Sequence, residues 1–183
     1  MNRQDAIVYL EQNIQSKNLI KHSLAVEAVM KKLAQHFGED EEKWALAGLL
    51  HDIDYESTRD DEEQHSIVGG KMLKEIGLDQ DIIDAVITHN EAHGIPRATL
   101  MAKSLFCTDP ITGLIVASAL VIPEKKLEAL TVDNILNRFK EKSFARGANR
   151  ETISACREID LTLNEFVALS LEAMKQISNN LGL

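Results

Sequence analysis

Histidine and aspartate side chains interrupt several apolar stripes at positions that would otherwise face a protein core. His51 and Asp52 directly follow the apolar run WALAGLL and open the stretch HDIDYE at residues 51–56. Four more titratable residues fall in line with apolar neighbours at helical spacing, namely His22, His65, His89 and Asp109. Imidazoles and carboxylates transfer protons and bind first-row metals, so these are the chemistries that the set offers.

Taken singly, each of these residues has an ordinary structural explanation. An inward histidine is most often a hydrogen-bonded core residue, and an inward aspartate usually caps a helix. Burying four imidazoles and two carboxylates separately, however, costs on the order of a few kcal/mol each. That cost is too high for a domain whose net stability is typically about 5–15 kcal/mol. A bound divalent cation offsets all of these costs at one point.

The cysteine content bears on the kind of metal site. Cys107 and Cys156 are the only cysteines and lie far apart in the sequence, so no Cys pair is available for a structural tetrahedral zinc site. Imidazole and carboxylate ligands suit Mn, Fe, Co, Ni or Zn in a catalytic site. We therefore predict a catalytic metal centre.

The elements that position these residues are predicted to be helices. From Leu19 the apolar residues recur at i, i+3 or i+4 as far as Phe37, and Gly38 ends the stripe. An N-terminal helix is expected around DAIVYL. Further helices are predicted over 41–53, 63–76, 79–90 with Asp79 as N-cap, 97–121 with a kink or break at Pro110, and three segments after Pro123.

The pattern predicts an all-α fold, a single compact helical bundle over residues 1–183. Thr162 and Glu165 form a capping-box pattern at the start of the last helix. Residues 94–96 and 123–130 are predicted loops, and no repeat or linker divides the chain.

Charge and hydropathy restrict the partners. The chain has 20 Lys and Arg against 29 Asp and Glu, a net charge of -9. This balance disfavours nucleic acid polymers and anionic membranes but leaves room for a small phosphorylated ligand. The longest apolar run, ITGLIVASALVI, is shorter than the roughly 20 residues of a spanning helix. The start of the chain lacks an apolar signal segment, so we expect a cytoplasmic protein with free thiols.

The order of these motifs resembles the HD-domain superfamily of metal-dependent phosphohydrolases, in its HDIG-type branch. The resemblance rests on His22, then HD at 51 and 52, then Asp109, and covers roughly residues 21–121. Here the motif reads HDID, with Asp54 in place of glycine and Tyr55 where many relatives have lysine. Residues 122–183 are left as a helical C-terminal portion.

Two further stretches resemble the binuclear HD-GYP-like members of the superfamily. HSIVGGKML, from His65, is similar to their His-x-x-x-Gly helix. HNEAHGIP, from His89, is similar to their His-His-Glu segment, with Asn90 in place of the second histidine.

The resemblance implies a ligand set and a reaction. It implies one or two divalent metals per chain (Mn, Fe, Co, Ni, Zn or Mg), the first held by His22, His51, Asp52 and Asp109. Asp52 would bridge to a second metal held by His65 and His89. A metal-activated water would then cleave a phosphate ester of a nucleotide or another small phosphorylated metabolite. Asp52, His89 and Glu91 are the predicted catalytic residues.

Other residues near the motifs have weaker predictions. His93 and Asp54 are candidates for proton transfer or for support of the ligands. Cys107 is expected in the core, and His36 at a helix end without chemistry. Four cationic residues either contact phosphate or are ordinary solvated charges, namely Arg97, Lys103, Lys125 and Lys126.

Three functions remain open from the sequence: a phosphohydrolase, a di-iron HD-type oxygenase, and a non-catalytic HD module that binds a ligand. Retention of a full first ligand set argues against the last, because a module freed from catalysis has no need of costly buried charges. The oligomeric state is not fixed by the sequence, and a homo-oligomer is compatible with it.

Overall fold

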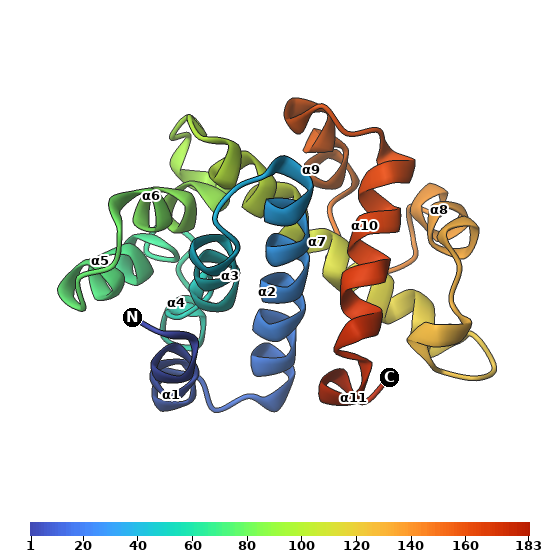
Figure 1. Ribbon diagram of the computed structural model, residues 1–183, viewed down its shortest axis with the longest axis horizontal. Helices are drawn as coiled ribbons and strands as arrows, with labels where there is room; N and C mark the ends of the chain where they lie inside the picture. Colours follow the sequence, from blue (N-terminus) through green and yellow to red (C-terminus); the bar gives the residue numbers. More distant parts are fainter.

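The longest amphipathic stripe of the sequence forms the central helix of the bundle. In the computed structural model, which describes residues 1–183, α2 (Lys17–Phe37) lies between α3 (Glu41–Leu50) and α10 (Leu163–Gln176) (Figure 1). Ser16 caps the start of α2, and Gly38 ends it in the left-handed conformation. The third long helix, α7 (Leu100–Val121), crosses behind α2 and α10 and contacts both.

The remaining elements cover the two ends of this framework. Towards the N-terminus the chain adds α1 (Arg3–Asn13), α4 (Tyr55–Thr58), α5 (Ile67–Glu75), α6 (Gln80–His89) and the 3₁₀ turn η1 (Glu91–His93). Towards the C-terminus it adds η2 (Leu127–Ala129), α8 (Val132–Lys140), α9 (Arg150–Ser154), η3 (Ala155–Ile159) and α11 (Ser178–Leu181). There is no strand, so the predicted all-α class is confirmed.

One hydrophobic core joins these elements. Its buried apolar side chains run from Ala6 in α1 to Leu181 in α11, and they include residues of every long helix. The capping box of Thr162 and Glu165 is present as predicted, and residues 94–98 form a loop. The segment 123–130 is a loop that contains η2.

Helix α7 is continuous, so the predicted kink or break at Pro110 does not divide it. The helix also starts at Leu100, with Thr99 as its N-cap, rather than at Arg97. Its length and hydropathy are sufficient to cross a membrane, but 61% of its most apolar 18-residue window is buried inside the bundle. The helix therefore serves as the core helix of this fold.

Several predicted helix ends are wrong. The helix predicted to reach Ile53 ends at Leu50, because the chain tightens into turns in which the amide of Ile53 bonds to the carbonyl of Leu50. The helix predicted from Glu63 begins at Ile67, after Ser66 with its φ of 68°. Asp79 is the N-cap of α6, as predicted, but its carboxylate makes no capping hydrogen bond and faces Lys43 at 3.3 Å instead.

The last two predicted segments are divided. The stretch NRETISACREI forms the short helix α9 and then changes to the 3₁₀ turn η3. The C-terminal stretch ends its long helix at Gln176 and adds a single turn, α11.

Candidate metal centre

Five parts of the chain bring the predicted ligands to one place. Helices α2, α6 and α7 carry His22, His89 and Asp109, but the other ligands lie in non-helical segments, contrary to the prediction of five ligand-bearing helices. His51 and Asp52 occupy the turn after α3, and His65 precedes α5.

A glycine allows the close approach of two of these helices. A Cβ atom at Gly48 of α3 would lie 2.8 Å from the carbonyl oxygen of Val26 in α2, closer than real side chains come. The absence of a side chain there lets α3 lie against α2, and His51 then follows within one turn of Gly48.

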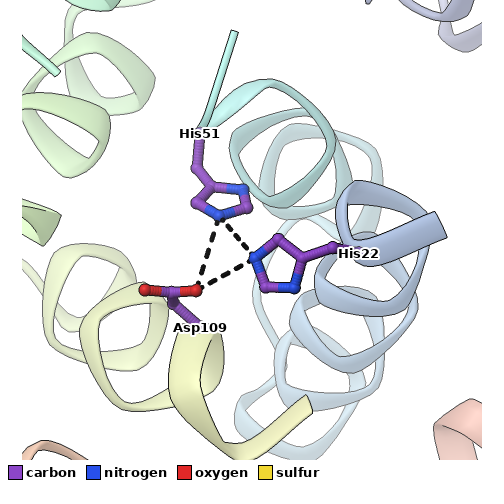
Figure 2. Close-up of side chains that lie close together, drawn as sticks. All are labelled: His22, His51 and Asp109. Atoms are coloured by element: carbon purple, nitrogen blue, oxygen red, sulfur yellow. Dashed lines mark hydrogen bonds and ion pairs between the residues drawn. The ribbon is translucent and has the colours of Figure 1, made fainter. Parts of the chain in front are cut away.

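The first group of ligand atoms comes from three elements (Figure 2). The Nε2 atom of His22 lies 3.0 Å from Oδ1 of Asp109 and 3.2 Å from Nε2 of His51. His51 Nε2 lies 3.7 Å from the same carboxylate oxygen. Asp52 adds its Oδ2 atom at 3.4 Å from His51 Nε2.

The second group lies on the other side of Asp52. Its Oδ1 atom is 3.4 Å from Nε2 of His65 and 3.4 Å from Nε2 of His89. The rings of these two histidines meet edge to face, with centroids 5.1 Å apart. The two carboxylate oxygens of Asp52 thus face two different pairs of imidazoles.

In each histidine the Nε2 atom faces the centre, and a hydrogen bond at the other ring nitrogen, Nδ1, holds the ring in this orientation. The Nδ1 atoms of His51 and His89 lie 2.9 Å and 2.6 Å from the backbone carbonyls of Gly48 and Val86. A carbonyl only accepts, so each Nδ1 carries the proton. The neutral ring then presents the lone pair of Nε2 to the centre.

The other two histidines follow the same rule. His65 Nδ1 lies 3.2 Å from the carboxylate of Asp54, which also only accepts. His22 Nδ1 lies 3.2 Å from the hydroxyl of Thr112, whose own proton is donated to the carbonyl of Asp109. The Nε2 atoms of all four histidines therefore face the two carboxylates.

This convergence fits a divalent cation. Lone pairs and carboxylate oxygens that face one another repel unless a positive charge lies between them. Ligand atoms about 2.1 Å from one ion lie roughly 3.0–3.4 Å apart. Most separations here fall in that range, and two are slightly longer, at 3.7 Å and 3.8 Å. His51, Asp52 and His89 are buried, so water cannot replace the missing charge at low cost.

The electrostatics agree with a site built for positive charge. Burial alone would raise the pKa of Asp52, but His51, His65 and His89 lower it well below its usual value. Burial likewise opposes the ionisation of Asp109, yet His22 and His51 lower its pKa. Burial disfavours the charged form of His65, but Asp52 and Asp54 raise its pKa to about 10.

Asp54 anchors the segment that carries His65. Its buried carboxylate accepts hydrogen bonds from the backbone amides of Ser66 and Gly69, both at 2.8 Å. A Cβ atom at Gly69 would lie 3.1 Å from Asp54, so the glycine leaves room for the carboxylate. Asp54 therefore supports a predicted ligand and is too enclosed to transfer protons to substrate.

Asn90 and His93 are also engaged in the local structure. The side-chain amide of Asn90 donates to the carbonyls of Glu62 and His65 and accepts from the amide of Ala92. His93 donates from Nε2 to the carbonyl of His65 at 2.7 Å. The two residues hold the loop after α6 against the segment before α5, and neither points a free ligand atom at the centre.

Glu91 is placed differently. Its side chain is exposed, makes no hydrogen bond within the chain, and borders two cavities that reach the ligand histidines. One cavity, of about 450 Å³, lies beside His65 and α4. The other, of about 180 Å³, lies between His65, His89 and Asp109.

The C-terminal portion contributes to the second cavity, which sequence reasoning missed. Gly147, Asn149 and Thr152 form its far wall. Asn149 is the N-cap of α9, and a short polar residue before a helix is the only sequence signal that marks this segment.

The remaining predicted residues do not border these cavities. The guanidinium of Arg97 lies 3.5 Å over the ring of Phe106, so packing accounts for it. Cys107 is buried in α7 as expected, with its thiol donating to the carbonyl of Ser104. Lys103, Lys125 and Lys126 make no side-chain contact with the ligand groups, and His36 lies in the last turn of α2.

Comparison with known proteins places this geometry in context. A family profile described as the HD domain matches residues 19–138. The chain is 31% identical to Ribonuclease Y of Lawsonia intracellularis over 141 residues. This aligned segment covers 74% of this chain and 26% of that protein. Ribonuclease Y of Nitratidesulfovibrio vulgaris is 34% identical over 141 residues, which again cover 74% of this chain and 26% of that protein.

A third relative extends the match towards the ends of the chain. Ribonuclease Y of Fusobacterium nucleatum is 29% identical over 170 residues, which cover 90% of this chain and 33% of that protein. The chain thus spans about a quarter to a third of the length of these relatives. No solved structure matches the chain.

Proposed function

The chain belongs to the HD-domain family, and from this membership and the geometry of its centre we propose that it is a metal-dependent phosphohydrolase. The observation that carries the proposal is the convergence of the Nε2 atoms of four histidines on the carboxylates of Asp52 and Asp109.

The ligand roles follow from the two carboxylate oxygens of Asp52, which face different histidines. His22, His51, Asp109 and one oxygen of Asp52 would hold a first divalent cation. His65, His89 and the other oxygen of Asp52 would hold a second. Bound cations would lower the pKa of a water molecule to near neutrality and would neutralise charge on a phosphoryl group.

Glu91 is the side chain best placed to move a proton. Its carboxylate is free of internal partners and lies where both cavities meet the ligand histidines. The Glu91 carboxylate would accept a proton from the attacking water and would then donate that proton to the leaving oxygen of the ester. Asp54 and His93 take no part in this step, because hydrogen bonds occupy them.

The substrate is proposed to be a nucleotide or another small phosphorylated metabolite. The name Ribonuclease Y of the relatives favours a second candidate, hydrolysis of RNA, and points away from the prediction that no nucleic acid polymer is bound. The net charge of -9 favours the small substrate, because a polyanion is repelled by an acidic surface.

The test is a metal count by elemental analysis, followed by assays of the loaded protein. Phosphate release is measured from nucleotides and sugar phosphates, cleavage from RNA oligonucleotides, and oxygen uptake from the same mixtures. Asp52→Ala should remove bound metal and lower turnover more than about 100-fold, since loss of a direct ligand exceeds the usual effect of losing a supporting residue.

The contrary outcomes are distinct. Metal-dependent oxygen uptake without phosphate release would identify the di-iron oxygenase. Wild-type protein that binds no metal and cleaves no ester would leave the HD fold as a non-catalytic module.

A further inference from the structure

The cavity that lies between α4 and the metal centre has the size and lining of a small-molecule site. Its volume of about 450 Å³ lies within the range of about 300–1,000 Å³ that ligand pockets occupy. It lies between α4 and the loop after α6, and His65 forms the wall it shares with the metal centre. Its other side chains include Tyr55, Thr58, Arg59, Glu62 and Glu91.

Tyr55 supplies the feature that distinguishes this cavity. It is the only aromatic side chain of the molecule that is exposed, because every other Phe, Tyr and Trp is buried or half-buried. The edge-to-face contact with His65, 88° at 5.3 Å, holds the ring in place beside a predicted metal ligand. An aromatic face held open to solvent in a cavity is a platform on which a planar base can stack.

The polar lining complements a nucleoside. Glu62 and Glu91 present carboxylates, which accept hydrogen bonds from ribose hydroxyls or base amino groups. Arg59 is 68% exposed, and its one ion pair, with Asp60 at 3.8 Å, is at the surface and weak. Its guanidinium is therefore available to the ligand, and Arg59 is the only arginine or lysine that lines the cavity.

We propose that this cavity binds the nucleoside part of a nucleoside monophosphate whose phosphate lies at the metal centre. Tyr55 stacks on the base, and Glu62 accepts hydrogen bonds from the nucleoside. The assignment rests on the proposed phosphohydrolase function and specifies its substrate class.

The charges around the cavity select a mononucleotide over a polynucleotide. Asp60, Asp61, Glu62 and Glu63 follow Arg59 without interruption, so the rim beyond the cavity is acidic. Each further nucleotide would bring another phosphate towards this rim, with no lysine and only one arginine in the cavity to receive it.

Nucleoside binding is measured first, on metal-free protein and with no phosphate in the ligand. Adenosine is titrated into wild type, Tyr55→Ala and Tyr55→Phe by calorimetry or ligand-observed NMR. Tyr55→Ala should weaken binding about ten-fold, whereas Tyr55→Phe keeps the ring and should bind like wild type. Val8→Ala, an exposed residue of α1, is the remote control. Failure of adenosine to bind, or equal binding by Tyr55→Ala, overturns the nucleoside site.

Turnover is measured second, on metal-loaded protein, with AMP, ribose 5-phosphate and an RNA tetranucleotide. Tyr55→Ala should lower the preference for AMP over ribose 5-phosphate, expressed as a ratio of kcat/KM, about ten-fold. Preferential cleavage of the tetranucleotide overturns the mononucleotide assignment.

The two measurements separate the two claims. Tyr55-dependent adenosine binding without hydrolysis of any ester supports the nucleoside site and overturns the phosphohydrolase. Hydrolysis with the same AMP preference in wild type and Tyr55→Ala supports the phosphohydrolase and overturns the nucleoside site.

Discussion

One carboxylate oxygen of Asp54 accepts hydrogen bonds from two backbone amides, and the other accepts a hydrogen bond from Nδ1 of His65. An asparagine at position 54 would keep the hydrogen bonds to the backbone, because its amide oxygen can still accept from the amides of Ser66 and Gly69. The amide nitrogen would then face His65 Nδ1 as a donor. The ring would have to carry its proton on Nε2, which blocks that atom as a metal ligand.

We expect Asp54→Asn to remain folded and to lose affinity at the second metal site by about 10–100-fold, with the first site retained. Metal counting and a manganese titration on each variant test this. Asp133→Asn, an exposed acid of α8, is the matched control. Two metals bound with wild-type affinity by Asp54→Asn would contradict the role of Asp54.

The residue types and their order were sufficient to predict which six side chains meet. Each of the six residues lies in line with apolar residues at helical spacing, and burial of those apolar residues directs the titratable side chain inward. The tautomer of each ring could not be predicted, because it depends on carbonyls such as those of Gly48 and Val86. The structural role of Asn90 was hidden for the same reason, since its partners lie 25 and 28 residues away.

At the scale of elements, the sequence predicted the helices better than their ends. Apolar spacing continues through Ile53, which is buried, so the pattern does not show that α3 ends at Leu50. The start of α5 depends on Ser66, whose positive φ is rare for a residue other than glycine. Tertiary contacts hold it there: its amide binds Asp54 and its hydroxyl binds the carbonyl of Ile87.

Arg150 organises the segment between α8 and α9. Its guanidinium donates to six backbone carbonyls, those of Arg138, Phe139, Glu141, Phe144, Ala145 and Ala148. The segment includes Ala145 with a φ of 46°, and it leads to Asn149 and Thr152 at the second cavity. No periodicity in the sequence indicates a side chain that binds only backbone carbonyls.

Arg150→Ala should destabilise the protein by about 2–4 kcal/mol, because several hydrogen bonds from a charged donor are lost together. Arg150→Lys should restore only part of this, since one ammonium cannot reach carbonyls spread around a planar guanidinium. Urea unfolding gives the free energies. Arg146→Ala, an exposed arginine of the same segment, is the control, and an equal effect of both alanine variants would refute the proposal.

At the scale of the whole molecule, the C-terminal portion lines a cavity that reaches the candidate metal centre. The family profile ends at residue 138, yet Gly147, Asn149 and Thr152 wall the second cavity. Their position follows from the packing of α9 and α10 on α7, which single-sequence patterns do not show.

The metal should also stabilise the whole fold, because the centre joins α2, α6, α7 and the segments around α3 and α5. A cation at 100 times its Kd adds about 2.7 kcal/mol to the free energy of unfolding. For a chain of this length that corresponds to a rise in Tm of roughly 5–10 °C. Thermal unfolding with chelator and then with added manganese or nickel measures the shift. Asp52→Ala should show almost none of it.

The size of this shift should depend on pH with a definite sign. In the metal-free protein the pKa of His65 is about 10, above its ordinary value of 6.5, so its ring carries two protons between pH 6 and pH 8. Its contribution to metal-free stability is complete below pH 6.5 and is lost as the pH rises towards 10. Metal binding at Nε2 displaces one proton, so affinity through this ligand should rise about ten-fold per pH unit. The metal-induced rise in Tm at fixed metal concentration should therefore be larger at pH 8 than at pH 6. His65→Ala should flatten that dependence, and a shift that falls with pH in the wild type would show that His65 does not bind the metal.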